Sequence, residues 1–141
     1  MFVRGFAVQV AVMMMPALPA LAQAALPAQA GAAIEAEIGA QMQAFRDGDA
    51  AAAFGHASPA IRSMFGSPEA FAAMVARGYP AIANPGTVRF LGLREVGGRL
   101  VERLSVVAPD GSSRLFDYEM VETDGGWRIN GVTPVAQGPA V

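Results

Sequence analysis

The sequence predicts an α+β domain in which several short helices come first and a curved four-stranded antiparallel sheet follows. Apolar residues at helical spacing, with serine or aspartate before several of the segments, occupy 33–78. Four strand-like runs then fill 87–96, 99–108, 114–122 and 127–134, and short glycine-containing turns separate them. Connections this short cannot cross over the sheet, so neighbouring strands must run antiparallel as a meander.

The first 22 residues have the three regions of a secretory signal peptide. Arg4 supplies the positive charge, residues 6–15 are mostly apolar, and Ala20-Leu21-Ala22 is a small-x-small cleavage pattern. A membrane anchor is the alternative, but spanning takes about 20 apolar residues, and Gln9 and two prolines interrupt this run. We therefore expect export, to the periplasm or as a secreted protein, with no transmembrane segment after cleavage. A flexible spacer over 23–32, the domain over 33–135 and a tail over 136–141 are expected to follow.

The composition excludes several classes of function. The 141-residue chain has 10 basic residues against 12 acidic ones, for a formal net charge of −2. No basic patch follows from this balance, so we expect no binding to nucleic acid. The chain has no cysteine and one histidine, which excludes disulfides, thiol nucleophiles and metal sites built on cysteines or several histidines. We expect no metal and no cofactor, and packing alone must hold the fold together.

The predicted helices have recognisable starts and ends. The first spans 33–47 with apolar residues at spacings of three and four, and Gly48 ends it. Asp49 caps a second, alanine-rich helix. Ser58-Pro59 and Ser67-Pro68 mark two further starts, because serine caps free amides and proline at the first helical position has no amide to lose. Gly78 is expected to close the last helix in a left-handed conformation, and a loop follows.

Turn lengths and side-chain alternation together predict the register of the sheet. The Gly97-Gly98 turn pairs Leu93 with Glu102 and Leu91 with Leu104. With an odd number of residues in the next loop, Leu104 faces Tyr118 and Val106 faces Phe116. The last turn pairs Met120 with Ile129 and Glu122 with Trp127.

This register divides the strand residues between two faces of the sheet. The helices are expected to cover the face that carries Leu91, Leu93, Leu104, Val106, Phe116, Tyr118, Met120, Trp127 and Ile129. The outer face then carries Phe90, Arg94, Arg103, Asp117, Glu119, Arg128 and Asn130, together with Val101, Val121 and Val132. Asp117 and Glu119 share that face with Arg103 and Arg128 as cross-strand neighbours, which indicates an exposed lattice of ion pairs. A face that is half apolar is also a plausible surface for a homodimer.

Short helices before a curved sheet, with a last strand that opens on Gly126-Trp127-Arg128-Ile129, resemble the NTF2-like, cystatin-like group of α+β cones. Within that group the chain resembles a bacterial family of unknown function, number 4864. The segments that carry this resemblance are 43–45, 57–59, 65–69, 78–80, 89–95, 117–120 and 126–132. The resemblance covers nearly the whole mature chain and implies a cone-shaped fold, but it brings no activity and no catalytic residues. The wider superfamily includes isomerases, dehydratases, polyketide cyclases and binding modules, so fold alone does not select a function.

Glu102 is the most informative candidate for chemistry, because the register puts a carboxylate on the apolar face. There it must be paired, hydrated or raised in pKa. A cone lined by Arg89, Glu102, Tyr118 and Trp127 would bind a small polar ligand or transfer protons. The alternative is that Glu102 reaches water at the strand end or bonds an amide at a helix end. His56, the only histidine, is either a general base at the mouth of the pocket or a surface residue on its rim.

These observations favour a small exported module without catalytic activity that binds a ligand or another protein. Its partner would be a small molecule or a protein of the cell envelope. A cofactor-free acid–base enzyme, isomerase-like or dehydratase-like, is the first alternative, with Glu102, Tyr118 or His56 acting on a small carbonyl compound. The second alternative is a structural accessory of the envelope that acts through the outer face of the sheet.

Overall fold

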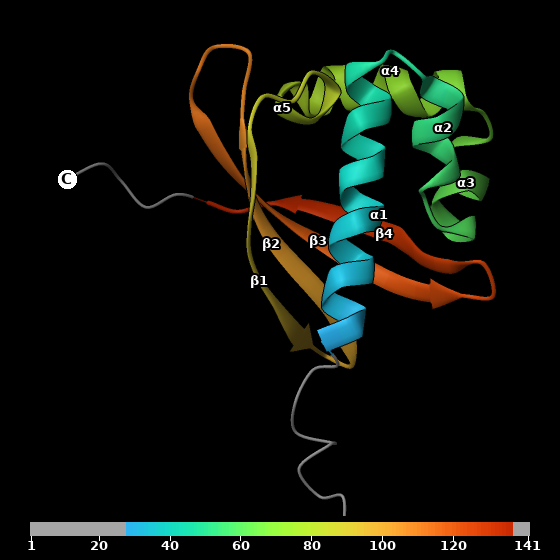
Figure 1. Ribbon diagram of the computed structural model, residues 1–141. Helices are drawn as coiled ribbons and strands as arrows, with labels where there is room; N and C mark the ends of the chain where they lie inside the picture. The colour runs from blue at the N-terminus through green and yellow to red at the C-terminus, as the bar shows by residue number, and fades with distance from the viewer. Residues whose placement is uncertain (1–27, 137–141) are drawn as a thin grey trace, which may run out of the picture.

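The computed structural model describes residues 28–136, and in them five helices precede a four-stranded sheet (Figure 1). The predicted signal peptide lies outside the described residues. The helices are α1 (Ala28–Arg46), α2 (Ala50–Gly55), α3 (Pro59–Phe65), α4 (Pro68–Gly78) and α5 (Pro80–Ala83). The strands are β1 (Val88–Val96), β2 (Arg99–Val107), β3 (Ser113–Thr123) and β4 (Gly126–Pro134). The strand order β1-β2-β3-β4 with antiparallel pairing confirms the predicted fold class.

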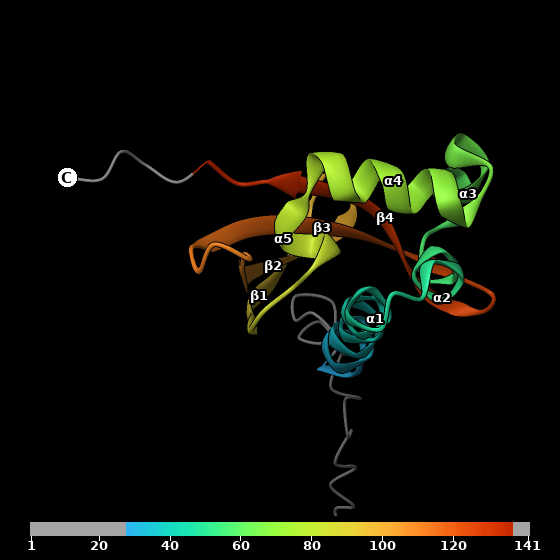
Figure 2. The same ribbon diagram turned by 90° about the horizontal axis from the view of Figure 1, so that it is seen from above.

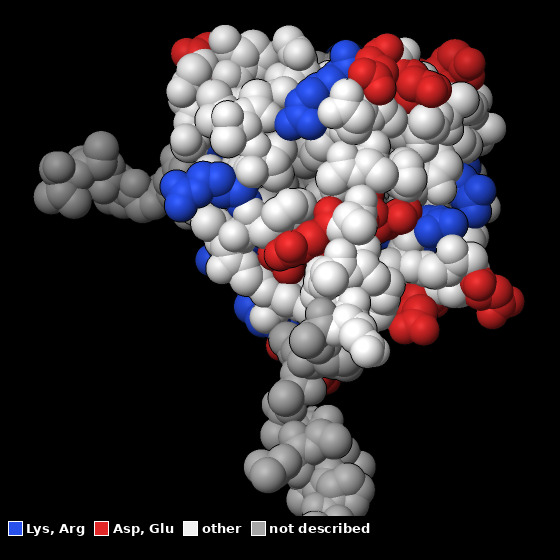
Figure 3. Space-filling model, viewed as in Figure 1, with Lys and Arg blue, Asp and Glu red and all other residues white. Residues whose placement is uncertain are grey.

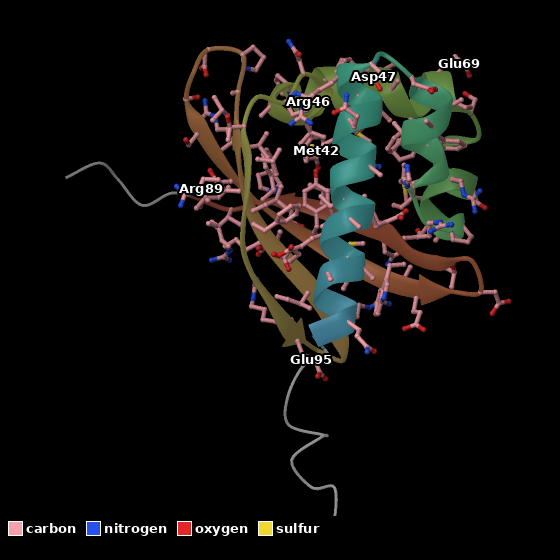
Figure 4. All side chains as sticks on the ribbon, viewed as in Figure 1. Met42, Arg46, Asp47, Glu69, Arg89 and Glu95 are labelled. Carbon is pink, nitrogen blue, oxygen red and sulfur yellow. The ribbon has the colours of Figure 1, made fainter. Side chains whose placement is uncertain are left out.

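Helix α1 packs its apolar stripe against the sheet. Ile34, Ile38 and Met42 are at most 1% exposed, and Figure 4 shows Met42 on the side of α1 that faces the strands. The helix begins at Ala28, inside the segment expected to be a spacer, because alanine and glutamine favour helix. No helix within residues 28–136 is long and apolar enough to cross a bilayer.

The predicted caps of α2, α3 and α4 are confirmed. The side chains of Asp49, Ser58 and Ser67 accept hydrogen bonds from backbone amides at the three helix starts, at 3.0, 3.2 and 3.2 Å. The end of α4 differs from the prediction, since Gly78 is helical and Tyr79, at φ −137°, ends the helix. The cause is Pro80, which disfavours the helical region for the residue before it and then starts α5 where a loop was expected.

The first hairpin confirms part of the predicted register. Gly97 and Gly98 have φ of 57° and 80°, as a two-residue turn of this kind requires, and Leu93 pairs with Glu102. The last hairpin also pairs Met120 with Ile129 and Glu122 with Trp127, as predicted.

A β-bulge in β1 reverses the predicted orientation of its first half. The register shifts between Phe90 and Gly92, so Phe90 pairs with Leu104 and Leu91 is the extra residue. Phe90 therefore packs against the core, whereas Leu91 is 49% exposed. Arg89, predicted to face inward, pairs with Ser105 on the outer face and is exposed; Figure 4 shows it at the edge of the sheet, away from α1. Arg89 therefore cannot line an inner pocket.

Two further corrections concern β3. The loop before it spans 108–112 instead of the expected 109–113, so Leu104 pairs with Phe116, and Glu102 rather than Leu104 pairs with Tyr118. A shift of two residues keeps every side chain on its predicted face. A second bulge, between Glu119 and Met120, brings Val132 opposite Tyr118, so Val132 packs on the core instead of facing outward.

The core lies between the inner face of the sheet and the helices. Figures 1 and 2 show α1 crossing the strands, with α5 beside the end of the sheet where β2 and β3 are joined. The largest fully buried side chains, at less than 2% exposure, are Tyr118, Ile34, Ile38, Met42, Leu104, Glu102, Val106 and Ser58. On the β4 side, residues 56–58 run beside the strand, where Ala57 forms a parallel bridge with Ile129.

Candidate functional site

Glu102 lies on the inner face of the sheet, as the register predicted, and the structure shows that it is buried there. It is 1% exposed, and its Oε1 atom has no hydrogen-bond partner within the described residues. Burial raises the pKa of Glu102 above its ordinary value, and the nearby negative charge of Glu35 raises it further. The backbone amide of Gly92, in the β1 bulge, opposes this shift through a hydrogen bond.

Tyr118 on β3 pairs with Glu102 on the neighbouring strand β2, and it is also fully buried. Its hydroxyl also has no hydrogen-bond partner among residues 28–136, and burial raises its pKa. The structure therefore brings these two candidates together as neighbours. The other two candidates, Arg89 and Trp127, do not join this pair. Arg89 lies on the outer face of the sheet. Trp127 pairs with Glu122, which is four residues, or roughly 13 Å, from Tyr118 along β3.

His56 belongs to a cluster at the β4 side of the molecule. Its Nδ1 atom lies 2.7 Å from Glu37 Oε1, and the same carboxylate oxygen accepts from Arg128 Nη1 at 3.3 Å. His56, Glu37 and Arg128 are 27%, 16% and 25% exposed. Backbone hydrogen bonds from Ile129 N to His56 O and from Ser58 N to Ile129 O hold the same segments together. The cluster connects α1, the end of α2 and β4, so its visible role is structural.

The predicted ion-pair lattice exists on the outer face, with partly different members. Asp117 accepts two hydrogen bonds from Arg103, as predicted, and two more from Arg94, at 2.7–3.2 Å. These guanidinium groups lower the pKa of Asp117 to about 2. Glu119 accepts hydrogen bonds from Arg99 and Asn130. Arg128, its expected partner, donates to Glu37 instead.

Charged groups form no large patch of one sign on the face that carries α1. Figure 3 shows acidic and basic side chains scattered among uncharged ones there. Among residues 28–136, no group of three or more histidine, aspartate or glutamate side chains is placed to hold a metal ion.

An apolar cleft of about 260 Å³ opens between α3, α4 and β4. It is lined by Gln41, Phe45, Ala57, Ile61, Met64, Phe65, Phe71, Met74, Val75, Tyr79, Ile82, Ile129, Gly131 and Val132. The rings of Phe45 and Phe65 pack on Phe71, with centroids 6.2 and 5.8 Å apart, and form part of its wall. Met64 is 72% exposed at this cleft. Neither Glu102 nor Tyr118 lines the cleft.

A second cavity, of about 430 Å³, lies where α5 meets the hairpin of β2 and β3. Asp110 and Arg114 on that hairpin line it together with Tyr79 and Phe116. Asp110 and Arg114 are largely exposed to water. Neither Glu102 nor Tyr118 lines this second cavity.

The sequence contains a signal for the cleft that the pattern analysis missed. Gln41 falls on the apolar stripe of α1, between Ile38 and Phe45, where a purely structural helix would carry an apolar residue. A polar side chain that is 2% exposed at such a position requires a hydrogen-bond partner. Its amide nitrogen donates to Ala53 O at 3.1 Å, and Gln41 is one of the residues that line the cleft.

Comparison with known proteins identifies a family but no activity. A family model described as "Domain of unknown function (DUF4864)" matches residues 27–140. No curated protein and no solved structure matches the sequence.

Proposed function

Because the chain belongs to the DUF4864 family, a domain of unknown function, we propose its role from geometry: it binds a small ligand in the apolar cleft between α3, α4 and β4, without catalysis. The cleft itself is the observation that carries this proposal. Its volume of about 260 Å³ approaches the range of roughly 300–1,000 Å³ typical of small-molecule sites. An apolar hollow beside the core exposes surface that a ligand would remove from water.

The exposed, weakly packed rim of the cleft supports the same role. Met64 is the most exposed large apolar side chain described, and methionine is unbranched and adapts to different surfaces. It stands on α3, a helix of seven residues with none buried, so the rim can adjust with little cost to the core. Val75 and Ile129, which also line the cleft, are buried in the core.

The lack of charged and imidazole side chains in the described part of the lining favours binding over catalysis. No aspartate, glutamate, histidine, lysine or arginine is among the described residues that line the cleft. The enzyme alternative is less well supported, because Glu102 and Tyr118 lie in the closed core and His56 is engaged with Glu37. A general base needs its substrate within hydrogen-bond reach.

Binding of a neutral fluorescent probe, N-phenyl-1-naphthylamine, tests the proposal. The probe should bind with a stoichiometry of one per chain and gain fluorescence in the apolar cleft. Ile61→Phe fills the cleft from α3, where no buried residue is disturbed, and should weaken binding about tenfold or more. Leu91→Phe is the matched control, because Leu91 is exposed at the β1 bulge outside the cleft. Equal binding by both variants, or no binding by the native protein, would reject the cleft as the site.

Export and the NTF2-like relationship are further parts of the proposal. Residues 1–22 have the order of regions of a signal peptide, and a four-stranded meander with helices on its inner face agrees with a cone of that superfamily. Amino-terminal sequencing of the protein from a periplasmic extract should begin at Gln23. An intact Met1 in that fraction would contradict cleavage.

The homodimer through the outer face stays a prediction. The ion pairs of Asp117 with Arg94 and Arg103 occupy much of that face and satisfy its charges within one chain. Light scattering over a wide concentration range decides this point, and a strict monomer would remove both the dimer and the envelope-accessory hypothesis that depends on the same surface.

A further inference from the structure

The chemistry of the cleft also restricts the ligand that it accepts. Resting on the function proposed above, we infer that this ligand is an uncharged, largely apolar molecule with one hydroxyl or N–H group, which donates a hydrogen bond to the carbonyl oxygen of Gln41. Three observations lead to this class: the lining carries no charge, the amide of Gln41 has a fixed orientation, and the hydroxyl proton of Tyr79 is already used.

The uncharged lining excludes ionic ligands. Burying an ionised carboxylate or ammonium in apolar surroundings costs more free energy than apolar contacts in such a cleft recover, unless an opposite charge pairs with it. The described residues of the lining supply no such charge. A fatty acid or an amine would therefore have to leave its head group in water.

The orientation of the Gln41 amide is set by its backbone partner. The partner is the carbonyl oxygen of Ala53, which only accepts, so the amide nitrogen of Gln41 must face it at 3.1 Å. Ala53 is 0% exposed and Gln41 is 2% exposed, so neither water nor a rotation of the side chain easily replaces this bond. The carbonyl oxygen of Gln41 is left as an acceptor on a residue that lines the cleft.

Tyr79 offers an acceptor for the same reason. Its hydroxyl donates to Val132 O at 3.3 Å, because a backbone carbonyl cannot donate. The phenol oxygen keeps its lone pairs, and Tyr79 also lines the cleft. Both polar side chains of the lining thus accept hydrogen bonds, so the ligand must supply the proton.

Four ligands with one eight-carbon chain test the inference: 1-octanol, octyl methyl ether, octanoate and octylammonium, each used to displace N-phenyl-1-naphthylamine at neutral pH. Octanol should displace the probe at the lowest concentration. The ether keeps the chain and an oxygen but has no proton to donate, and it should need about two- to tenfold more. The two ions should need still higher concentrations than the ether.

Gln41→Met tests the role of the amide, since methionine has a similar length and no strong acceptor. The variant should bind the probe more weakly, because the probe also carries an N–H group, and its preference for octanol over the ether should fall, with Tyr79 left as the remaining acceptor. If this variant does not fold, the comparison of alcohol and ether on the native protein decides alone. Equal displacement by octanol and the ether, or by octanoate, would overturn the inference while leaving the cleft a binding site. Failure of the probe to bind at all would instead reject the proposed function.

Discussion

The substitution Glu102→Gln is expected to stabilise the protein at neutral pH. Glu102 is 1% exposed, and its Oε1 atom lacks a partner within the described residues, so the folded chain disfavours its ionised form. Glutamine keeps the size and one oxygen of the protonated acid but cannot ionise. The gain should therefore depend on pH, which separates it from an ordinary change in packing.

The sign and size follow from the proton balance of folding. The pKa of Glu102 is raised above the ordinary value of 4.5 in the folded state. Its contribution to stability is fully present below pH 4.5 and is lost as pH rises through the raised folded pKa. In that window the folded chain keeps a proton that the unfolded chain has released, and stability falls by up to about 1.4 kcal/mol per pH unit. The interval from pH 4.5 to 7 sets a ceiling of about 3.4 kcal/mol on the advantage of Glu102→Gln.

Urea unfolding followed by the fluorescence of Trp127, the only tryptophan, measures this effect between pH 4.5 and 8. The free energy of unfolding of the two proteins should agree within about 1 kcal/mol at pH 4.5, and the variant should be favoured increasingly as pH rises. All other titrating groups are common to both proteins, so their effects cancel in the difference. Glu95→Gln is the matched control, because it removes a carboxylate that is exposed on the neighbouring strand (Figure 4).

One result would refute the reasoning. If Glu102→Gln destabilises the protein at pH 7 as much as at pH 4.5, the carboxylate is ionised in the core and has a partner there. The closed-core description of Glu102 would then be wrong, and the acid–base hypothesis would regain support.

Three further predictions concern contacts that hold the fold. Asp117→Asn should lower the free energy of unfolding by about 1–2 kcal/mol at pH 7, measured by urea unfolding. The pKa of Asp117 is lowered to about 2, so its contribution to stability is present above pH 3.8 and is lost as the pH falls toward 2. An equal loss of stability at pH 2 would contradict this. Ser58→Ala removes the cap of α3 and a hydrogen bond to Asn130, and should lower stability by about 1–2 kcal/mol in a thermal melt, whereas Ser67→Ala should cost less because its site is exposed. Glu37→Ala should accelerate hydrogen exchange of the Ile129 amide, which donates to His56 O, and unchanged exchange would show that the cluster does not hold this segment.

Local rules in the sequence predicted the parts of the fold that depend on neighbours along the chain. Asp49, Ser58 and Ser67 cap helices because a short oxygen-bearing side chain satisfies an amide two or three residues later. The Gly97-Gly98 turn sets Leu93 opposite Glu102, and this pairing puts a carboxylate on the face of the sheet that the helices cover.

Rules of this local kind could not predict the two β-bulges or the cleft. Alternation around Leu91 is equally consistent with a regular strand and with one extra residue, and the choice between them depends on whether Phe90 or Leu91 fits against Leu104. Because the bulge is present, Arg89 lies on the outer face of the sheet and not in the predicted pocket. The cleft depends on the gap that α3 and α4 leave beside β4, which no single segment encodes.

The pairing of residues 56–58 with β4 has a consequence for how the sheet meets other chains. A strand at the border of a sheet presents unpaired amides and carbonyls, which recruit strands from neighbouring molecules. On the β4 side, Ile129 already exchanges hydrogen bonds with His56 and Ser58, so that border is partly occupied from within the chain. The border on the other side is β1, where the bulge at Leu91 interrupts the regular spacing and Arg89 adds a charge. The same bulge that removed Arg89 from the interior therefore makes β1 a poor template for aggregation.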